Sequence, residues 1–540
     1  MAVVGIDLGT TNSVVAAVRD GRVTVIHDAQ KRRLHPSVVS FHPNGSTLYS
    51  YDAVARRIVD GRNTIYSAKR LIGQPFRSPE VKYAAARMSY KIEEGPNEQV
   101  AIKSRGRTYS VPEVSGLVLA YLKRCAEDFL GEAVDRAVVT VPANFNDAQR
   151  RATIDAGRIA GLDVLRVLNE PTAAALAYGA GRGMSQKIGI YDLGGGTFDV
   201  TVLQVEGDIF EVLATGGDTF LGGDDVDSAL MALLAEQFLT EFKFDLRTDE
   251  VARSRLLLAA EQIKRHLSMQ TEAKGELKEM AFGAGGKPLD LRFHVSRARF
   301  EKEVSPLVER TIKTCDDVLR LADLAGSQLD EVIMVGGSTR IPLVRARVAE
   351  HFGKPSRVNI NPDEVVAWGA AIQAHALAFG AEDPAAKAVL LDVTPRGLGI
   401  AVAGGYAETI VERNAQVPVE QTRVFTTSAD NQTQVRIQVC QGESRRFDEN
   451  VAMGELTLSG FRAARRGEVK IEVSFGVDTN GIMRVRAQDP DTGVAQEATV
   501  NVRGALSENE VAAATTRTAD HQSRDTDGDA SAAPPPALLE

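Results

Sequence analysis

The sequence predicts an α/β domain followed by an all-β domain, because its pattern changes once along the chain. Up to about residue 380, short apolar strands alternate with long amphipathic segments. From about 395 to 503, short alternating strands separated by turn residues replace the helices, which is typical of a β-sandwich. The domains that we expect are therefore an α/β domain at 1–382, a linker at 383–394, a β-sandwich at 395–503 and a tail at 504–540.

Periodicity and end signals define the helices of the first domain. Asp147 is a favourable N-cap for a helix that runs to Ile159, and Gly161 can supply the left-handed turn just beyond its end. Helical periodicity also predicts helices at 114–129, 224–242, 249–268, 297–323 and 363–379.

The second domain carries strand and hairpin signals. Strict alternation of apolar and polar residues predicts strands at 435–439 and 471–475. Asn480-Gly481 is a hairpin signal between two of the strands of this region.

The segments on either side of this domain have a different composition. The apolar cluster 389–391 precedes Asp392 in a linker that we expect to be exposed. After Gly504 the chain loses aromatic residues and gains Ala, Thr, Asp and Ser, which predicts a disordered tail. Within that tail we expect at most a short helix at 506–514.

Composition excludes several classes of protein. The chain has 540 residues, too many for one hydrophobic core, and no apolar stretch long enough to cross a bilayer. Its N-terminus lacks a basic region ahead of an apolar segment, so we expect a soluble, cytoplasmic protein. A net charge of -9 argues against nucleic-acid binding. Cys125, Cys315 and Cys440 are far apart and odd in number, and we expect them to be buried free thiols.

A weak internal repeat marks the chemistry of the first domain. GIDLGTT (5–11) recurs as IYDLGGGT (190–197), and each copy combines a strand, an Asp-Leu-Gly turn and a second strand. Glycines at such hairpin tips let backbone N–H groups approach phosphate oxygens, and threonine hydroxyls add further donors. Two facing tips of this kind can clamp a triphosphate.

Acidic residues beside these tips indicate a metal ion. Asp7, Asp192 and Asp199 would repel phosphate unless a hard cation lay between, so we expect Mg²⁺ held largely through water. A third glycine turn, VGGSTR (335–340), follows another apolar strand and is suited to support the nucleoside. One such turn alone would be an ordinary hairpin, whereas three together favour nucleotide binding; no Walker or dinucleotide-binding spacing competes.

At these turns the sequence resembles a known family. GIDLGTTNS (5–13), YDLGGGTFDV (191–200) and VGGSTRIP (335–342) closely resemble the three signatures of the heat-shock 70 (DnaK-like) chaperone family. Similarity continues to about residue 503, and further similar segments lie at 139–150, 169–179 and 361–371. The resemblance implies an actin-like, two-lobed ATPase domain that closes on MgATP, followed by an all-β sandwich that binds peptides.

The resemblance also assigns roles within the first domain. It implies that Lys69 holds the γ-phosphate and the attacking water and that Thr197 lies near the γ-phosphate. The family's acidic cluster, which positions Mg²⁺ and orients water, is matched by Asp7, Glu170, Asp192 and Asp199. Which of these carboxylates acts as the base stays open. Contacts to ATP are implied for Gly9, Thr10, Thr11, Asn12, Lys69, Gly194, Gly195, Gly196, Thr197, Glu261, Lys264, Arg265, Ser268, Gly336, Gly337, Ser338, Arg340 and Asp363.

Peptide binding and coupling are implied in the same way. The channel that accepts an apolar peptide side chain is matched by Ile400, Val402, Phe425, Val435 and Ile437, and the arch over the peptide by Ala403 and Ser428. Residues matched to interdomain coupling or to a J-domain cochaperone are Pro142, Arg150, Arg166, Leu390, Leu391 and Asp392. A nucleotide exchange factor is a further partner that the resemblance suggests.

The chain departs from the family at three places. Asn144 stands where the family has an aromatic or similar residue, so we expect an altered coupling between the nucleotide site and the linker. Trp368 replaces a smaller residue. The tail is shorter than the family's helical lid, so we expect modest peptide affinity and fast release in ADP.

Three functions stay in competition at this point. The first is an ATP-dependent chaperone that assists folding and the stress response. The second keeps the ATPase but makes the β-domain a docking or regulatory module for one folded partner. The third is a sugar kinase of the actin superfold, which the β-domain and linker argue against.

Overall fold

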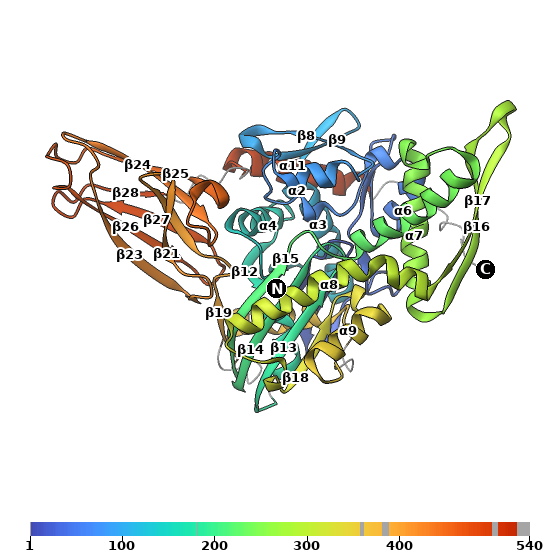
Figure 1. The fold of residues 1–540 in the computed structure, drawn as a ribbon, viewed down its shortest axis with the longest axis horizontal. Helices are drawn as coiled ribbons and strands as arrows, with labels where there is room; N and C mark the ends of the chain where they lie inside the picture. Colours follow the sequence, from blue (N-terminus) through green and yellow to red (C-terminus); the bar gives the residue numbers. More distant parts are fainter. Residues whose placement is uncertain (1, 181, 357–360, 381–387, 499–505, 526–540) are drawn as a thin grey trace.

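The computed structural model describes residues 2–180, 182–356, 361–380, 388–498 and 506–525. A two-lobed α/β domain forms the bulk of the molecule, and a β-sandwich projects from it at one end of the long axis (Figure 1). The hairpin of β16 (Glu272–Phe282) and β17 (Pro288–Ser296) lies at the opposite end. The predicted fold class, an α/β domain followed by an all-β domain, is confirmed.

The first lobe is built on a sheet of order β12-β11-β1-β2-β3, with β4 paired to β2. Its first three strands form an antiparallel meander, and β11 and β12 join it in parallel. The strands are β1 (Ala2–Asp7), β2 (Asn12–Arg19), β3 (Arg22–Val25), β4 (His35–Pro36), β11 (Val134–Val141) and β12 (Asp163–Asn169).

Two small sheets, a group of helices and several short connections complete this lobe. The small sheets contain β5 (Val39–Phe41), β6 (Thr47–Tyr49), β7 (Thr64–Ile65), β8 (Lys91–Glu94), β9 (Val100–Ser104) and β10 (Arg107–Ser110). The helices are α1 (Ser50–Val59), α2 (Pro79–Ala85), α3 (Val111–Leu130), α4 (Asp147–Ile159) and α5 (Glu170–Gly179).

The start of α4 differs by one residue from the prediction. Asn146, rather than Asp147, is the N-cap, and its side chain accepts a hydrogen bond from the Gln149 backbone N–H. The Gln149 side chain accepts one from the Asn146 N–H in return, which completes a capping box. Asp147 is thereby free to contact the sandwich through Met483.

The second lobe repeats the topology of the first. Its strands β13, β14 and β15 form an antiparallel meander, and β18 joins β13 in parallel. Each lobe therefore carries its glycine turn between the first two strands of a meander, as the sequence repeat predicts. The strands are β13 (Met184–Leu193), β14 (Phe198–Gly207), β15 (Ile209–Asp218) and β18 (Glu331–Val335), and the helices are α6 (Gly223–Phe242), α7 (Glu250–Met269), α8 (Arg297–Leu321) and α9 (Pro342–Phe352). The following helix, α10 (Val365–Phe379), packs on β1 and β2 of the first lobe.

Helices α5 and α10 pack closely against each other in the core between the two lobes. An added Cβ at Gly369 of α10 would lie 1.8 Å from the carbonyl oxygen of Ala173 in α5, so these helices touch backbone to backbone. Trp368 of the same helix is half-buried against a cluster that includes Val14 and Val25 of the first lobe's sheet, so packing accommodates the larger residue. The three cysteines are buried free thiols, as predicted.

The linker is not exposed over its full length, which corrects the prediction. Residues 389–393 form strand β19 (Val389–Val393), which pairs in parallel with β15 at Ile209–Glu211. The same strand pairs antiparallel with β22 (Gln416–Val417) of the sandwich. The second lobe's sheet, of order β18-β13-β14-β15-β19-β22, therefore continues across the domain boundary. Residues 383–387 lie outside the described part of the chain.

The sandwich consists of two four-stranded sheets, of order β21-β20-β24-β25 and β23-β26-β27-β28. Its core includes Val439, Val473, Phe475 and Val485, which alternate with exposed residues along their strands. The Asn480-Gly481 hairpin is confirmed, although five residues, 478–482, separate β26 from β27. The strands are β20 (Leu398–Val402), β21 (Tyr406–Val411), β23 (Val419–Thr426), β24 (Gln434–Gln441), β25 (Val451–Ser459), β26 (Lys470–Val477), β27 (Met483–Gln488) and β28 (Ala495–Ala498).

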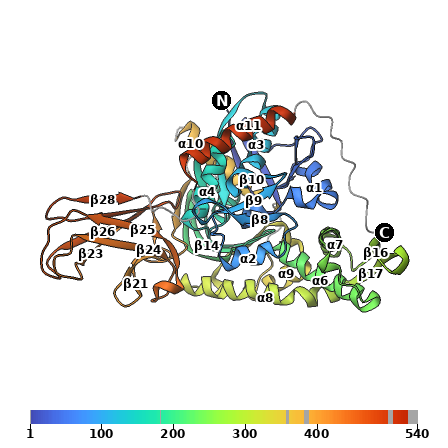
Figure 2. The same ribbon diagram turned by 90° about the horizontal axis from the view of Figure 1, so that it is seen from above.

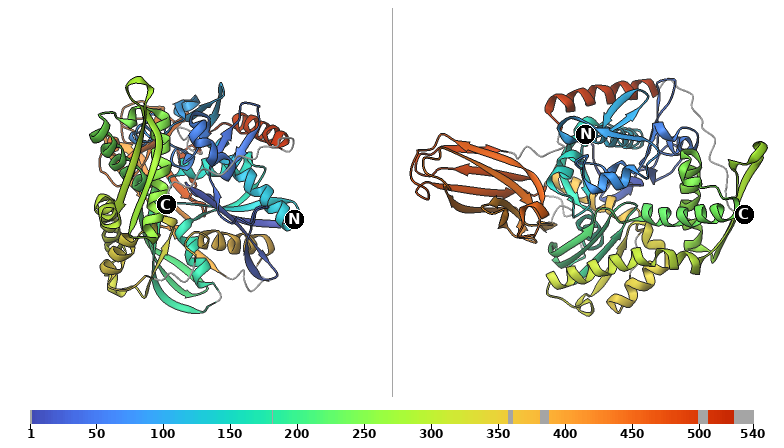
Figure 3. Two further views of the ribbon diagram at one scale, coloured as in Figure 1. Left: turned by 90° about the vertical axis from the view of Figure 1, so that its right-hand side faces the viewer. Right: turned by 45° about the horizontal axis from the view of Figure 1, so that its top comes forward.

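The tail contains a longer helix than expected. Helix α11 spans Glu508–Asp525 and lies along the first lobe, away from the sandwich (Figures 2 and 3). Val511 and Ala514 pack with Ile159 of α4, and Arg517 forms a two-point ion pair with Glu113 of α3. Residues 526–540 of the tail lie outside the described part.

No helix in the described ranges is both long enough and apolar enough to span a bilayer.

Candidate functional site: an interlobe nucleotide cleft

A cleft of about 540 Å³ opens between the two lobes. The turns β1–β2 and β13–β14 form one end of it, and the turn after β18 and helix α7 form the other. Among its lining residues are most of those predicted to contact ATP: Gly9, Thr10, Thr11, Asn12, Lys69, Gly194, Gly195, Thr197, Glu261, Lys264, Arg265, Ser268, Gly336, Gly337, Ser338, Arg340 and Asp363.

The two facing turns approach each other closely enough to require glycine. An added Cβ at Gly195 would lie 1.9 Å from the hydroxyl oxygen of Thr11 on the opposite turn. Gly336 has a φ of +83°, which L-residues rarely adopt, and a Cβ there would lie 2.4 Å from the Leu193 carbonyl oxygen. The backbone is thus exposed to the cleft where a phosphate chain would need N–H donors.

Lys69 carries a positive charge into a largely acidic site. Its ammonium group lies 2.5 Å from Oε1 of Glu170, and both side chains are buried. The ring of Phe145 lies 5.7 Å from Nζ of Lys69, on the other side. Because the ammonium group is desolvated and held by one carboxylate, its electrostatic attraction for an anion in the cleft is little screened by water.

The remaining carboxylates of the cluster repel one another. Burial, followed by the charge of Glu170, raises the pKa of Asp7 to about 7 and the pKa of Asp199 to about 7. Burial and the charges of Glu170, Asp199 and Asp7 raise the pKa of Asp192 well above its usual value. A cation near these groups would offset this repulsion.

The donor set fits Mg²⁺ bound through water better than a directly ligated metal. Asp7 and Asp192 face the cleft, and both offer the oxygen ligands that Mg²⁺ prefers. Within the described ranges, however, no three His, Cys, Asp or Glu side chains converge to form a metal site by themselves. Mg²⁺ usually keeps several waters and takes further ligands from substrate phosphates, which suits this arrangement.

At the other end of the cleft, polar side chains from three elements are fixed by internal contacts. Lys264 of α7 lies 2.9 Å from Asp227 of α6, and Arg265 lies 2.7 Å from Glu261. Arg340 pairs with Asp363 at 2.5 Å. These pairs hold the guanidinium and ammonium groups at the rim, where a base and ribose would lie against a mixed polar and apolar wall.

Two predicted residues do not line the cleft. Gly196 lies behind the turn, where an added Cβ would meet Thr10 and the Arg70 guanidinium. Asp199 is 1% exposed and lies beneath the cleft surface. The sequence analysis assigned no role to seven further lining residues, some of which lie within the motifs that it quoted: Leu34, Met269, Val335, Ile341, Arg345, Pro362 and Val366.

A comparison with protein families agrees with this geometry. The family model described as "Hsp70 protein" matches residues 3–533, which is nearly the whole chain. The chain belongs to the Hsp70 family. Membership brings with it the family's general properties, namely chaperone function, ATP hydrolysis and the use of ATP with Mg²⁺.

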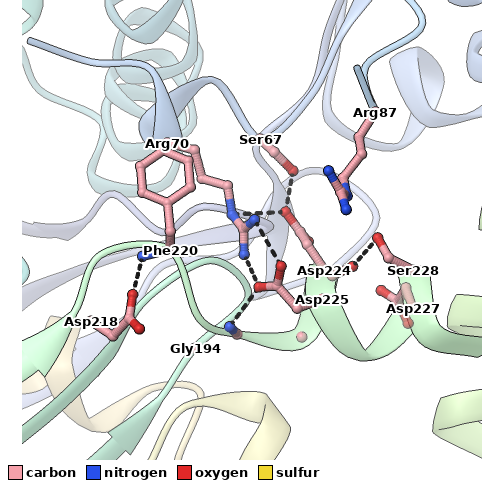
Figure 4. A network of polar contacts seen from close by, with 12 residues as sticks. Ser67, Arg70, Arg87, Gly194, Asp218, Phe220, Asp224, Asp225, Asp227 and Ser228 are labelled. Atoms are coloured by element: carbon pink, nitrogen blue, oxygen red, sulfur yellow. Dashed lines mark hydrogen bonds and ion pairs between the residues drawn. The ribbon is translucent and has the colours of Figure 1, made fainter. Parts of the chain in front are cut away.

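In this Hsp70 chain an interlobe clamp closes the cleft from one side. Arg70 and Ser67 of the first lobe point toward Asp224 and Asp225 at the start of α6 (Figure 4). Arg70 lies 2.5 Å from Asp225 Oδ2, and Ser67 donates to Asp224 at 2.8 Å. The N–H of Gly222, the N-cap of α6, also donates to Asp225, so this carboxylate both caps its own helix and holds Arg70. The next N–H, of Gly223, donates to the Gly194 carbonyl oxygen in the glycine turn of the second lobe.

A second polar network joins the Hsp70 ATPase domain to the linker. The Asp392 carboxylate accepts hydrogen bonds from Asn169 Nδ2 at 2.7 Å and from Thr172 Oγ1 at 3.2 Å. Arg150 donates to Asn169 Oδ1 at 2.7 Å and to the Asn480 carbonyl oxygen of the sandwich at 3.3 Å. Arg150 and Asp392, which the sequence analysis named as separate coupling residues, are thus connected through one asparagine.

The other predicted coupling residues lie around the same network. Arg166 lines a small pocket of about 30 Å³ with Asp392, but its buried Nε has no hydrogen-bond partner in the described part of the chain. Pro142 begins the turn before α4, where its carbonyl oxygen accepts from Phe145. Leu390 and Leu391 are half-buried in β19.

The residues predicted to bind peptide form part of one cluster between the two sheets of the sandwich. Ile400 and Ile437 are buried, whereas Val402, Phe425 and Val435 are only partly buried. Ala403 lies in the exposed turn after β20, and Ser428 lies in the exposed loop after β23. The half-buried members lie toward the surface of the cluster, where a peptide side chain would enter.

Proposed function

We propose that this chain is an ATP-dependent chaperone that binds and releases unfolded polypeptide segments, with peptide affinity controlled by nucleotide state. The observation that carries the proposal is strand β19. It pairs with β15 of the ATPase domain and with β22 of the sandwich. A change in the cleft that moved β15 would therefore reach the sandwich through hydrogen bonds.

The chemistry of the cleft supports hydrolysis of a terminal phosphate. Lys69 would stabilise charge that develops on the transferring phosphoryl group, and Glu170 fixes the ammonium group in place. The glycine turns would bind and orient the phosphate chain through their N–H groups. Mg²⁺, when bound with the nucleotide, would neutralise phosphate charge, with Asp7 and Asp192 holding its waters.

The surface of the sandwich supports an extended, apolar ligand. Val402, Phe425 and Val435 are partly buried at the edge of the cluster between the two sheets. Extended peptides bind such surfaces through backbone hydrogen bonds and pockets for alternate side chains. Arg166 and Asp392 at the domain boundary are the proposed contact for a J-domain cochaperone, and a nucleotide exchange factor is a further proposed partner.

The decisive experiment measures dissociation of a fluorescent apolar peptide from the full chain with ATP and with ADP. We expect faster release with ATP, and equal rates would refute coupling. Competition by unrelated apolar peptides separates a general chaperone from a module for one folded partner, which such peptides would not displace. Absence of sugar phosphate after incubation with ATP and sugars would exclude the kinase.

A further inference from the structure

Asn144 joins the interdomain network to a carboxylate of the acidic cluster. It lies in the turn between β11 and α4 and is 5% exposed. Its side-chain Nδ2 donates to Asp199 Oδ1 at 2.8 Å, and its backbone N–H donates to the same oxygen at 3.2 Å. Two donors from one residue fix the position of that oxygen more narrowly than a single hydrogen bond would.

The surrounding backbone leaves room for this pair of hydrogen bonds. An added Cβ at Gly217 of β15 would lie 2.4 Å from Nδ2 of Asn144 and 3.0 Å from Oδ1 of Asp199. Gly217 is also the cross-strand partner of Asp199. The absence of a side chain at this position therefore allows the asparagine to reach the carboxylate, and the site has no space for a larger residue at 144 in the same orientation.

Arg150 holds the turn that carries Asn144. Its Nε donates to the Phe145 carbonyl oxygen at 3.0 Å, and its NH2 group donates to the Ala143 carbonyl oxygen at 3.1 Å. These are the carbonyl groups of the residues on either side of Asn144. The position of the asparagine thus depends directly on the position of one guanidinium group.

That guanidinium group also contacts the other domain. It donates to Asn480 of the sandwich and to Asn169, which in turn donates to Asp392 of the linker. At the far end of the path, Asp199 is the cross-strand partner of Asp192, which lines the cleft. A continuous series of hydrogen bonds and one strand pair therefore runs from the linker to the nucleotide cleft.

We propose that Asn144 is a positioning residue for ATP hydrolysis, which holds Asp199 in a fixed orientation and relaxes that hold when the sandwich and linker leave Arg150. The proposal rests on the function proposed above. It concerns a residue that departs from the family's aromatic position, so the link is a property of this chain. The asparagine acts through Asp199 and does not itself touch the nucleotide cleft.

The test compares Asn144→Ala with Asn146→Ala in the full chain. Asn146 lies in the same turn and caps α4, so its loss weakens the turn without removing a donor to Asp199. We expect single-turnover ATP hydrolysis to fall about tenfold in Asn144→Ala, as for loss of one hydrogen bond to a charged group. ATP affinity should stay within about twofold of wild type, because nothing that lines the cleft is removed. Asn146→Ala should hydrolyse ATP at nearly the wild-type rate.

A double-mutant comparison tests the path to the linker. Asp392→Asn should change the single-turnover rate in the wild-type background and change it much less when residue 144 is already alanine. Thermal unfolding of each variant verifies that it is folded, and Asn144→Ser, which keeps a short polar side chain, serves as a second variant.

The outcomes separate the two proposals. Equal single-turnover rates for Asn144→Ala, Asn146→Ala and wild type would overturn the positioning role while leaving the proposed function intact. If the Asp392 and Asn144 substitutions changed the free energy of activation for single-turnover hydrolysis additively, the proposed path from the linker to Asp199 would be overturned. If wild type itself failed to hydrolyse ATP, the proposed function and the positioning role would fall together, and that result is recognised without any variant.

Discussion

A partly buried ion pair is one of the contacts that hold helix α11 on the ATPase domain, and Arg517→Ala should weaken this attachment. The Glu113 carboxylate is 1% exposed and accepts from Arg517 Nε at 2.7 Å and from its NH2 group at 2.9 Å. His521 of the helix is also buried, where it packs against Phe41 and shares a hydrogen bond with Thr47 Oγ1 at 2.8 Å. The aliphatic contact is small, since it consists of Val511 and Ala514, which are buried with Ile159. Burial of these two side chains contributes about 2–3 kcal/mol, and the ordering of the helix opposes it.

The size of the effect follows from the geometry of the pair. Hydrogen bonds to a charged group contribute about 1.5–3 kcal/mol, and the Arg517 side chain is 42% exposed, so screening lowers the figure. We expect a loss of about 2 kcal/mol, which is roughly a 30-fold shift toward the detached helix. The matched control is Arg158→Ala. Arg158 pairs with Glu508 on the same helix, but Glu508 is 79% exposed, so solvent screens this pair and its loss should have a much smaller effect.

Hydrogen exchange of the α11 amide groups measures this equilibrium directly. Protection should fall about 30-fold in Arg517→Ala and by no more than a few-fold in Arg158→Ala, while thermal unfolding of the ATPase core changes little. Unchanged protection in Arg517→Ala, or equal losses in the two variants, would show that the buried carboxylate does not determine where the helix lies.

Three further predictions concern the cleft, the linker and pH. Lys69→Ala should leave ATP binding largely intact but suppress single-turnover hydrolysis, because its charge acts chiefly in the transition state; an unchanged rate would remove Lys69 from the mechanism. Asp392→Asn should abolish J-domain stimulation, since the amide cannot accept from Asn169 and Thr172 in the same way; undiminished stimulation would contradict the linker role. Burial raises the pKa of Asp155 from 3.8 to about 6, so its protonation stabilises the fold below pH 3.8 and this stabilisation is lost as pH rises to about 6. In Asp155→Asn, the free energy of unfolding should therefore fall less between pH 4 and 6 than in wild type, by up to about 3 kcal/mol. Urea unfolding at a series of pH values measures it, and an equal pH dependence of the unfolding free energy in the two proteins would refute this.

The parts of the fold that the sequence predicted well are those with local signals. The glycine turns at 5–11 and 190–197 are confirmed as equivalent turns in two lobes, because each needs small residues where strands and phosphate-binding N–H groups meet. The long helices at 224–242 and 249–268 agree with α6 and α7 within one residue. Periodicity sufficed because each helix buries one continuous face.

The parts that were missed depend on distant partners. Residues 389–391 carry a strand-forming apolar pattern, but only the free edge of β15 makes them a strand. Helix α11 buries too little apolar surface to be recognised from composition, and its anchor, Glu113, is far away in the sequence. In the site, Asn144 holds the Asp199 carboxylate beneath the cleft by donating hydrogen bonds to it, and no motif indicated that these two residues are partners.

The shared strand β19 has a consequence for how this chain behaves in crowded solution. When β19 is paired, it covers the outer edge of β15 at Ile209–Glu211, and Ile209 is 44% exposed even so. Release of the linker would uncover a row of unpaired N–H and C=O groups beside apolar side chains, which is the kind of edge that recruits strands from other chains. The linker is therefore also a protective cover for its own ATPase domain, and the time that it spends undocked sets how long that edge is open to self-association.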